Sequence, residues 1–114
     1  MCIRVVNLRN YVPSENEVLF RIDRQSVVGN PFYMSCEAER DKVCDEYDKY
    51  FYNIIASYKI NGDINNLSNK QREFVLYLAR ICNQAKKSDV ALGCWCAPKR
   101  CHGLTIKKFI EKYV

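Results

Sequence analysis

Three cysteines, the only tryptophan and the only histidine of the 114-residue chain lie within residues 92–103, LGCWCAPKRCHG. Thiols and imidazoles are the side chains that act as nucleophiles, proton carriers and metal ligands near neutral pH. The segment follows an apolar run and precedes a helical pattern, which is where α/β proteins often place ligands. We therefore expect a functional site in this segment.

A metal centre is one interpretation of the segment. The set Cys94, Cys96, Cys101 and His102 offers three thiolates and an imidazole, the ligands of a tetrahedral zinc site. The spacing departs from the usual pair of cysteines two to four residues apart, and adjacent residues seldom both ligate one ion. Zinc is thus a candidate cofactor, with no other cofactor indicated.

An anion site is the second interpretation. Gly103 is expected to adopt a left-handed conformation and to free backbone N–H groups at the start of the last helix, where phosphates bind. Arg100 would add positive charge and Trp95 would stack on a base or ribose. His102 would serve as acid or base, and Cys101 would be the nucleophile near a helix N-terminus. A third interpretation leaves the cysteines in the core and His102 as a helix cap.

A second turn carries a polar cluster of its own. Gly29 and Asn30, in the Gly-Asn-Pro-Phe run 29–32, follow a predicted strand, and Arg24 precedes them. If the strands run parallel, this turn and the cysteine-rich segment open at the same sheet edge. Asn7 and Arg9, at the end of the first predicted strand, would join that edge. All five residues are candidate ligand contacts.

Hydrophobic periodicity predicts six elements in the order strand, strand, helix, helix, strand, helix. They span residues 3–8, 18–23, 40–58, 69–86, 90–96 and 104–114. This order predicts one α/β domain over residues 1–114. Its sheet would be short, mixed or parallel, with about three or more strands, flanked by three helices and Rossmann-like.

Individual positions follow from the same patterns. Ser68 is the expected N-cap of helix 69–86, and Cys2, Cys44 and Cys82 are expected to be small buried hydrophobes. The residues of that helix predicted to face inward are Phe74, Val75, Leu78, Ala79, Cys82 and Ala85.

The charge distribution favours an anionic partner. The net charge is +5, and residues 89–114 hold five basic against two acidic residues. Nucleic-acid binding is less favoured, because most tyrosines fall on apolar helix stripes and no dense basic stripe exists. No apolar run approaches the roughly 20 residues of a membrane helix. The first nine residues do not resemble a secretory signal, so we expect a cytosolic protein without a membrane partner.

Several motifs together resemble one known family. The matching stretches are Val6–Arg9, Arg24 with Ser26–Phe32, Arg40–Asp41 with Tyr47, and Leu92–Pro98 with Cys101–Gly103. They resemble the phage and bacterial domain of unknown function called DUF4326. The resemblance implies a small α/β domain in a phage or mobile-element protein that acts in a bacterial cytosol. It implies no particular reaction.

These observations predict a protein that binds or modifies a nucleotide or phosphosugar. A zinc-stabilised module that binds nucleic acid or a host protein is the alternative. A non-catalytic sponge for a host nucleotide signal is a further one. The sequence leaves open whether the protein is an enzyme and how many copies assemble.

Overall fold

A sheet of three parallel strands forms the base of the molecule, in the order β1-β3-β2. The computed structural model describes residues 2–61 and 67–112. Within them β1 spans Ile3–Asn7, β2 spans Glu17–Arg21 and β3 spans Asp89–Cys94. All three strands therefore end at the same edge of the sheet, as the parallel alternative of the prediction requires.

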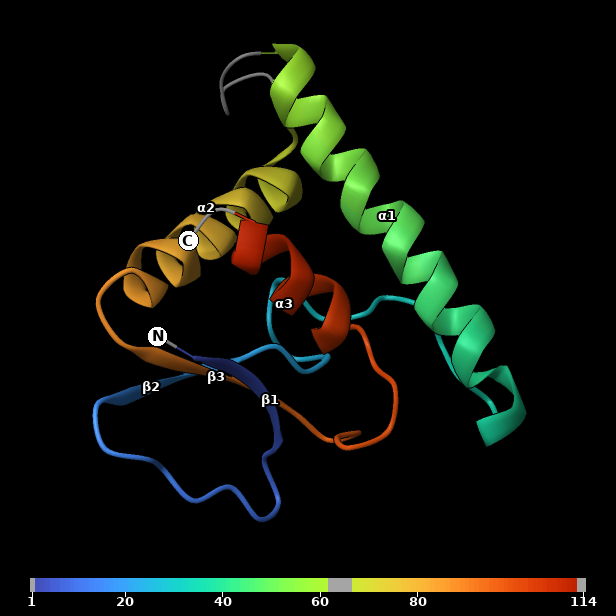
Figure 1. The fold of residues 1–114 in the computed structure, drawn as a ribbon. Coiled ribbons are helices and arrows are strands. Elements are labelled where there is room, and N and C mark those ends of the chain that lie inside the picture. The colour runs from blue at the N-terminus through green and yellow to red at the C-terminus, as the bar shows by residue number, and fades with distance from the viewer. Residues whose placement is uncertain (1, 62–66, 113–114) are drawn as a thin grey trace.

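The register of the strands separates two faces of the sheet. Leu92 in β3 aligns with Val5 in β1 and with Phe20 in β2, and all three belong to the hydrophobic core or pack against it. On the opposite face, a Cβ added at Gly93 would lie 2.5 Å from Leu8 Cδ2. Leu8 belongs to the segment between β1 and β2, which lies below this face (Figure 1), and its side chain packs close to the glycine.

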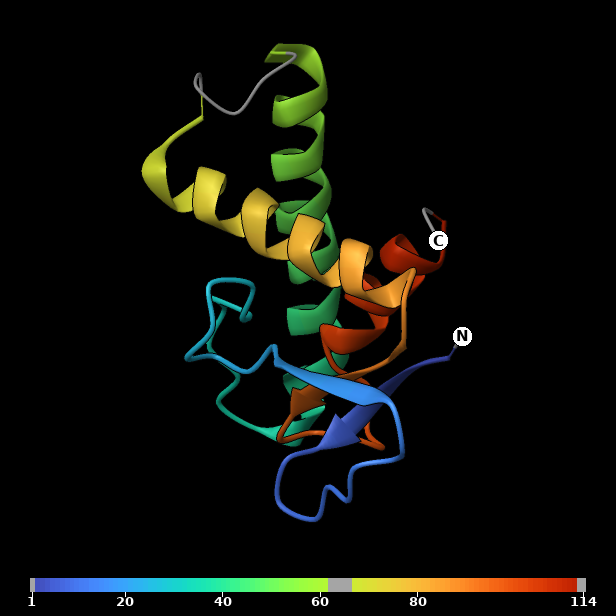
Figure 2. The same cartoon turned by 90° about the vertical axis from the view of Figure 1, so that its left-hand side faces the viewer.

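Three α-helices occur within the described residues. They are α1 (Arg40–Asn61), which follows the short 3-10 helix η1 (Glu37–Glu39), α2 (Asn69–Ala85) and α3 (Gly103–Lys112). Helices α2 and α3 lie over one face of the sheet, and α1 runs alongside them (Figures 1 and 2). This confirms the predicted small α/β domain with three helices, and the arrangement is compatible with a Rossmann-like fold. No helix in this part of the chain is long and apolar enough to cross a membrane.

Helix α2 begins where its sequence predicts. Ser68 accepts a hydrogen bond from the Gln71 backbone N–H, and the Gln71 side chain accepts one from the Ser68 backbone in return. This capping box satisfies two donors that the first turn would leave unpaired. The buried face is correct at Phe74, Leu78 and Ala85 but also includes Ile81, which the prediction omitted.

Ala79, predicted to face inward, is exposed. The buried positions of α2 advance by four, three and four residues along a narrow stripe, and Ala79 lies beside that stripe.

The expectation for the cysteines also needs one correction. Cys44 is buried and Cys82 is half-buried, but Cys2 is exposed. Cys2 lies just before β1, where its backbone N–H donates to Asp89 Oδ1 at 2.7 Å.

Helix α1 is joined to the other helices by aromatic contacts. Phe51 is fully buried, and its ring centroid lies 5.6 Å from that of Phe74 in α2 and 5.3 Å from that of Phe109 in α3. Edge-to-face ring pairs of this kind favour one packing arrangement over others. Of the loop predicted at residues 61–68, residues 62–66 lie outside the described residues.

The irregular segment 22–36 leads from β2 to η1 and is anchored to the core. Ile22 continues the sheet by donating its N–H to the Gly93 carbonyl at 2.9 Å. Val28 is fully buried, and its carbonyl accepts a hydrogen bond from Tyr47 Oη at 2.7 Å. Long connections fixed in this way often carry function, and this one forms a wall of the site described next.

Candidate functional site

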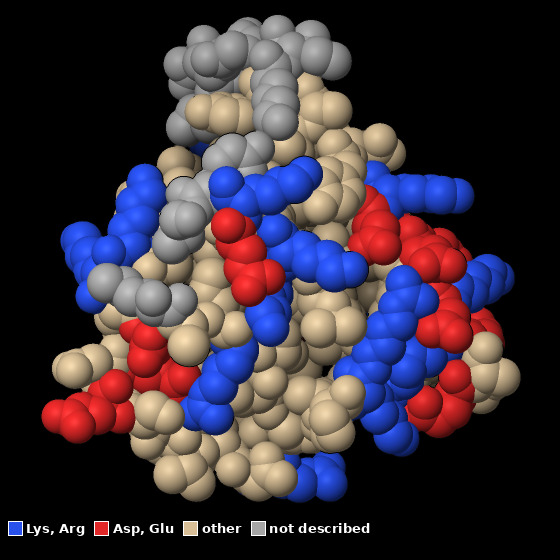
Figure 3. All heavy atoms as spheres, viewed as in Figure 1, with Lys and Arg blue, Asp and Glu red and all other residues tan. Residues whose placement is uncertain are grey.

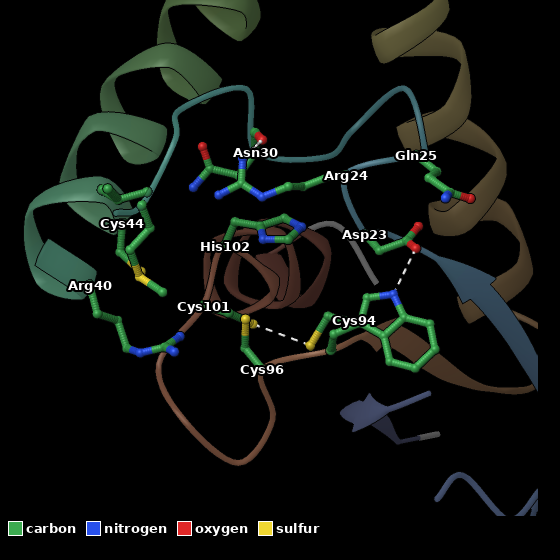
Figure 4. A pocket seen from close by; sticks show the side chains of 13 residues that line it. Asp23, Arg24, Gln25, Asn30, Arg40, Cys44, Cys94, Cys96, Cys101 and His102 are labelled. Atoms are coloured by element: carbon green, nitrogen blue, oxygen red, sulfur yellow. Dashed lines mark hydrogen bonds between the residues drawn. The ribbon is translucent and has the colours of Figure 1, made fainter. Parts of the chain in front are cut away.

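A pocket of about 280 Å³ opens at the carboxyl ends of β2 and β3 (Figure 4). Its lining comes from segment 22–36, the start of α1, the end of β3 and the loop before α3. The residues used below are Asp23, Arg24, Asn30, Arg40, Cys44, Cys94, Trp95, Cys96, Cys101 and His102. The turn at Asn30 and the turn at His102 therefore meet in one cavity, as expected from parallel strands.

The first wall depends on a close backbone approach at Gly29. A Cβ at this position would lie 2.3 Å from the Asp23 carbonyl oxygen and 2.7 Å from Arg24 Cα. Gly29 itself does not line the pocket. The absence of a side chain lets residues 23–30 fold back on themselves and place Asn30 against the cavity.

Asn30 and Arg24 are held against each other. Asn30 is buried, its Oδ1 accepts the Phe32 N–H at 2.8 Å, and its carbonyl accepts Arg24 Nη1 at 2.8 Å. Among the described residues, Asn30 Nδ2 has no hydrogen-bond partner and Arg24 has no ion pair. Both side chains therefore retain donors for a ligand.

Asn7 and Arg100, two predicted ligand contacts, instead hold the loop of residues 95–102. Asn7 Nδ2 donates to the carbonyls of Trp95 at 3.3 Å and Ala97 at 3.0 Å. Arg100 pairs with two carboxylates of α1 at 2.9 and 2.8 Å, those of Asp41 and Asp45. Neither side chain lines the pocket. They position the loop, because each bridges segments far apart in the sequence.

Arg9 also lies outside the pocket, with its side chain exposed. Arg40, at the start of α1, lines the pocket instead. It pairs with Glu37 at 2.7 Å and donates from Nη1 to the Arg100 carbonyl at 2.9 Å. The Glu37 carboxylate, followed by the Cys96 sulfur, raises the pKa of Arg40 above its ordinary value. Arg40 thus links α1, the loop and the cysteine cluster.

Cys94 and Cys101 form a pair with their sulfur atoms 3.4 Å apart. The hydrogen bond from Cys101 lowers the pKa of the Cys94 thiol to about 6, assisted by the backbone N–H groups of Cys96 and Ala97 and opposed by burial. The same contact and burial raise the pKa of Cys101. The pair therefore holds one proton at neutral pH, with the negative charge on Cys94.

The thiolate of this pair is not on the cysteine that the sequence favours as a nucleophile. The sequence points to Cys101, because it lies beside His102 and a helix start. The structure gives Cys94 the environment that stabilises a thiolate and leaves Cys101 as the donor. Backbone N–H groups after β3 make this difference, and their directions cannot be read from residue spacing.

His102 is buried, and its Nε2 faces the Ile22 carbonyl oxygen. A carbonyl only accepts hydrogen bonds, so Nε2 carries the proton and Nδ1 is the basic nitrogen. Burial lowers the pKa of the imidazole, and its ring packs 5.1 Å from that of Tyr47. His102 is thus a neutral pocket residue at pH 7, with Nδ1 as a hydrogen-bond acceptor.

Gly103 has a structural role that differs from the expected one. It has no left-handed backbone, and its N–H donates to Cys101 Sγ at 3.3 Å. A Cβ here would lie 2.9 Å from both Ile22 Cδ1 and Val5 Cγ1. The glycine lets α3 approach the sheet closely, and its N–H is not free for a phosphate.

The four predicted zinc ligands, Cys94, Cys96, Cys101 and His102, all line the pocket. Yet among the described residues no group of three or more His, Cys, Asp or Glu side chains is arranged to hold a metal ion. His102 contributes to this result, since its Nε2 is directed at a backbone carbonyl.

Asp23 is a polar pocket residue that sequence reasoning did not single out. Only 3% of its surface is exposed. Its Oδ2 accepts hydrogen bonds from Trp95 Nε1 at 3.0 Å and from Arg21. The sequence feature that could have indicated Asp23 is its position just after β2 and immediately before Arg24. The indole contact fixes Trp95, a residue that is 53% exposed and lines the pocket.

Comparison with known proteins assigns a family and nothing more specific. No curated protein and no solved structure matches the chain. One family model, described as Domain of unknown function (DUF4326), matches residues 6–112, which include every pocket residue named above. The chain belongs to the DUF4326 family.

Proposed function

We propose that this protein binds a small anionic ligand of nucleotide or phosphosugar type in the pocket at the carboxyl ends of β2 and β3. The observation that carries the proposal is the meeting of the Asn30 and His102 turns in one cavity. Ligands in open parallel sheets bind at this edge. The volume of about 280 Å³ lies near the lower end of small-molecule sites.

The positive charge of Arg24 favours a ligand with an anionic group beside this residue. Of the two arginines that line the pocket, Arg40 is paired with Glu37, whereas Arg24 has no ion pair among the described residues. A guanidinium with free N–H groups binds phosphate oxygens well, and the free Nδ2 of Asn30 adds a neutral donor nearby. These two residues would hold the phosphate.

The aromatic ring of Trp95 favours a ligand that contains a planar base or a sugar ring. Trp95 is anchored through its indole N–H while its ring lines the pocket. A fixed aromatic ring gives stacking area at little entropic cost. His102 Nδ1 would accept a hydrogen bond from the same ligand. If the protein modifies its ligand, the Cys94 thiolate is the candidate nucleophile.

The test is a calorimetric titration with the four ribonucleoside 5′-monophosphates and ribose 5-phosphate. We expect at least one to bind wild type and to bind Arg24→Gln about 10- to 100-fold more weakly, since the Arg–phosphate hydrogen bonds are lost. Arg80→Gln is the matched control, because it removes one exposed positive charge of α2 outside the pocket.

Two results would contradict the proposal: no binding of any probe to wild type, or equal losses in both variants. Native mass spectrometry of the same samples tests the zinc alternative, which predicts one retained metal ion per chain. Recovery of a bound probe chemically unchanged indicates a sponge, and recovery of a product indicates an enzyme. The cytosol of a phage-infected bacterium, the setting that the family resemblance implies, completes the proposal.

A further inference from the structure

One oxygen of the Asp23 carboxylate has hydrogen-bond partners and the other has none. Its Oδ2 accepts two hydrogen bonds, from Trp95 Nε1 and from Arg21. Its Oδ1 is the one buried side-chain nitrogen or oxygen without a hydrogen-bond partner among the described residues. Leaving a buried carboxylate oxygen unpaired costs free energy, so native proteins rarely do so without a reason. Here the residue lines the pocket.

We propose that Asp23 Oδ1 accepts a hydrogen bond from a hydroxyl or amino group of the bound ligand. This inference rests on the proposed function and narrows its ligand class. The ligand must carry an O–H or N–H donor as well as its anionic group. A nucleoside monophosphate and a sugar phosphate meet this requirement, whereas a simple phosphate monoester without such a donor does not.

The protonation state of Asp23 agrees with a purely accepting role. Burial raises the pKa of the carboxyl group, but the hydrogen bonds from Arg21 and Trp95 outweigh burial and bring the pKa below its ordinary value. The group is therefore ionised at neutral pH and has no proton to donate. A ligand that offers only acceptors at this point would be repelled.

The neighbours of Asp23 explain why the donor and the anion would belong to one molecule. Arg24 follows Asp23 in the chain, and the ring of Trp95 is tied directly to the carboxylate (Figure 4). The Arg24 side chain extends toward Asn30 and the Asp23 carboxylate toward Trp95, and both residues line the same pocket, so one ligand that spans the cavity can contact both (Figure 4). Ribose hydroxyls and base amino groups both supply such a donor.

Asp23→Asn tests the inference with little change in shape. The amide oxygen can still accept from Trp95 Nε1 and Arg21, which places the NH₂ group where Oδ1 was. An acceptor becomes a donor, so the ligand hydroxyl or amino group loses its partner. We expect ribose 5-phosphate or a nucleotide to bind about 10- to 100-fold more weakly.

Methyl phosphate is the comparison ligand, because it carries the anionic group but no hydroxyl or amino group that could donate to Asp23. Its affinity should stay the same or rise in Asp23→Asn, because a negative charge leaves the pocket. A loss confined to nucleotides identifies a base amino group as the donor, and a loss that includes ribose 5-phosphate identifies a sugar hydroxyl. Asp89→Asn is the matched control, since Asp89 lies at the opposite end of β3 and outside the pocket.

Thermal unfolding without ligand shows that the variant is folded. Its midpoint should stay close to that of wild type, because the amide oxygen keeps the hydrogen bonds from Trp95 and Arg21. Probes that bind wild type and Asp23→Asn equally would overturn this inference and leave the proposed function standing. Equal losses for all probes, methyl phosphate included, or a variant that unfolds, would also overturn it. No binding to wild type would overturn both proposals.

Discussion

At the scale of single residues, the two sulfur atoms of Cys94 and Cys101 share one proton across 3.4 Å. Both thiols are buried, so neither would ionise readily by itself. The charge is carried by Cys94 because it also receives the N–H groups of Cys96 and Ala97. The resulting thiolate lies in the pocket beside the neutral imidazole of His102.

This arrangement predicts a titration that can be measured directly. The ultraviolet absorbance of thiolates should rise in wild type with a midpoint at about pH 6. Cys94→Ser should lack this step, whereas Cys36→Ser should keep it, because Cys36 is exposed and outside the pocket. A first thiolate step near the ordinary cysteine pKa of about 8.5 would refute the assignment.

The same pKa shift links stability to pH. Between about pH 6 and about pH 8.5 the folded chain has lost the Cys94 proton while the unfolded chain retains it. The free energy of unfolding therefore rises with pH across this window, and the contribution disappears as the pH falls through about 6. Cys94→Ser should flatten this part of the profile.

At the scale of elements, the glycines show how closely the segments around the site approach one another. At Gly29 the obstacle to a side chain is backbone, the Asp23 carbonyl and Arg24 Cα. At Gly103 the obstacles are the ends of the Ile22 and Val5 side chains, which can move. The two positions should therefore respond differently to the same substitution.

Gly29→Ala should lower the free energy of unfolding by about 3 kcal/mol, at the upper end of overpacking costs. Gly103→Ala should cost about 1 kcal/mol, because rotation of two side chains relieves the contact. Urea unfolding of both variants measures the difference. If Gly29→Ala were the milder of the two, the described backbone approach at the pocket wall would be incorrect.

Elements with a local signal were predicted correctly. The capping box at Ser68 depends on residues three positions apart, and it lies where expected. Gly103 was predicted to supply backbone freedom and Gly29 to contact a ligand, but both glycines allow close packing. Close packing depends on residues from other elements, which no local pattern contains.

At the scale of the whole molecule, parallel strands explain why two distant turns meet. The order of elements was enough to predict the convergence of Asn30 and His102. The contacts that select among the candidates were not predictable, because they join partners far apart in sequence. The Arg40 bond to the Arg100 carbonyl spans 60 residues, and the Trp95 bond to Asp23 spans 72.

The distribution of charge also belongs to this scale. In the view of Figure 3, acidic and basic side chains lie next to each other over the lower part of α1. Arg100 pairs with Asp41 and Asp45 of α1 and thereby fastens the loop of the site. On this face the basic residues do not form a surface of one sign, so the proposed binding of an anion depends on the pocket and on Arg24.

The central claim is that a small anionic ligand enters this pocket, and the only tryptophan of the chain reports on it. Trp95 lines the cavity and donates its indole N–H to Asp23, so a ligand there must change its fluorescence. The most direct measurement is a fluorescence titration of wild type with ribose 5-phosphate and the ribonucleoside 5′-monophosphates. Our account predicts a saturable change with at least one of them, displaced to about 10- to 100-fold higher concentration in Arg24→Gln. An emission spectrum that no probe changes, in a folded protein, would contradict it.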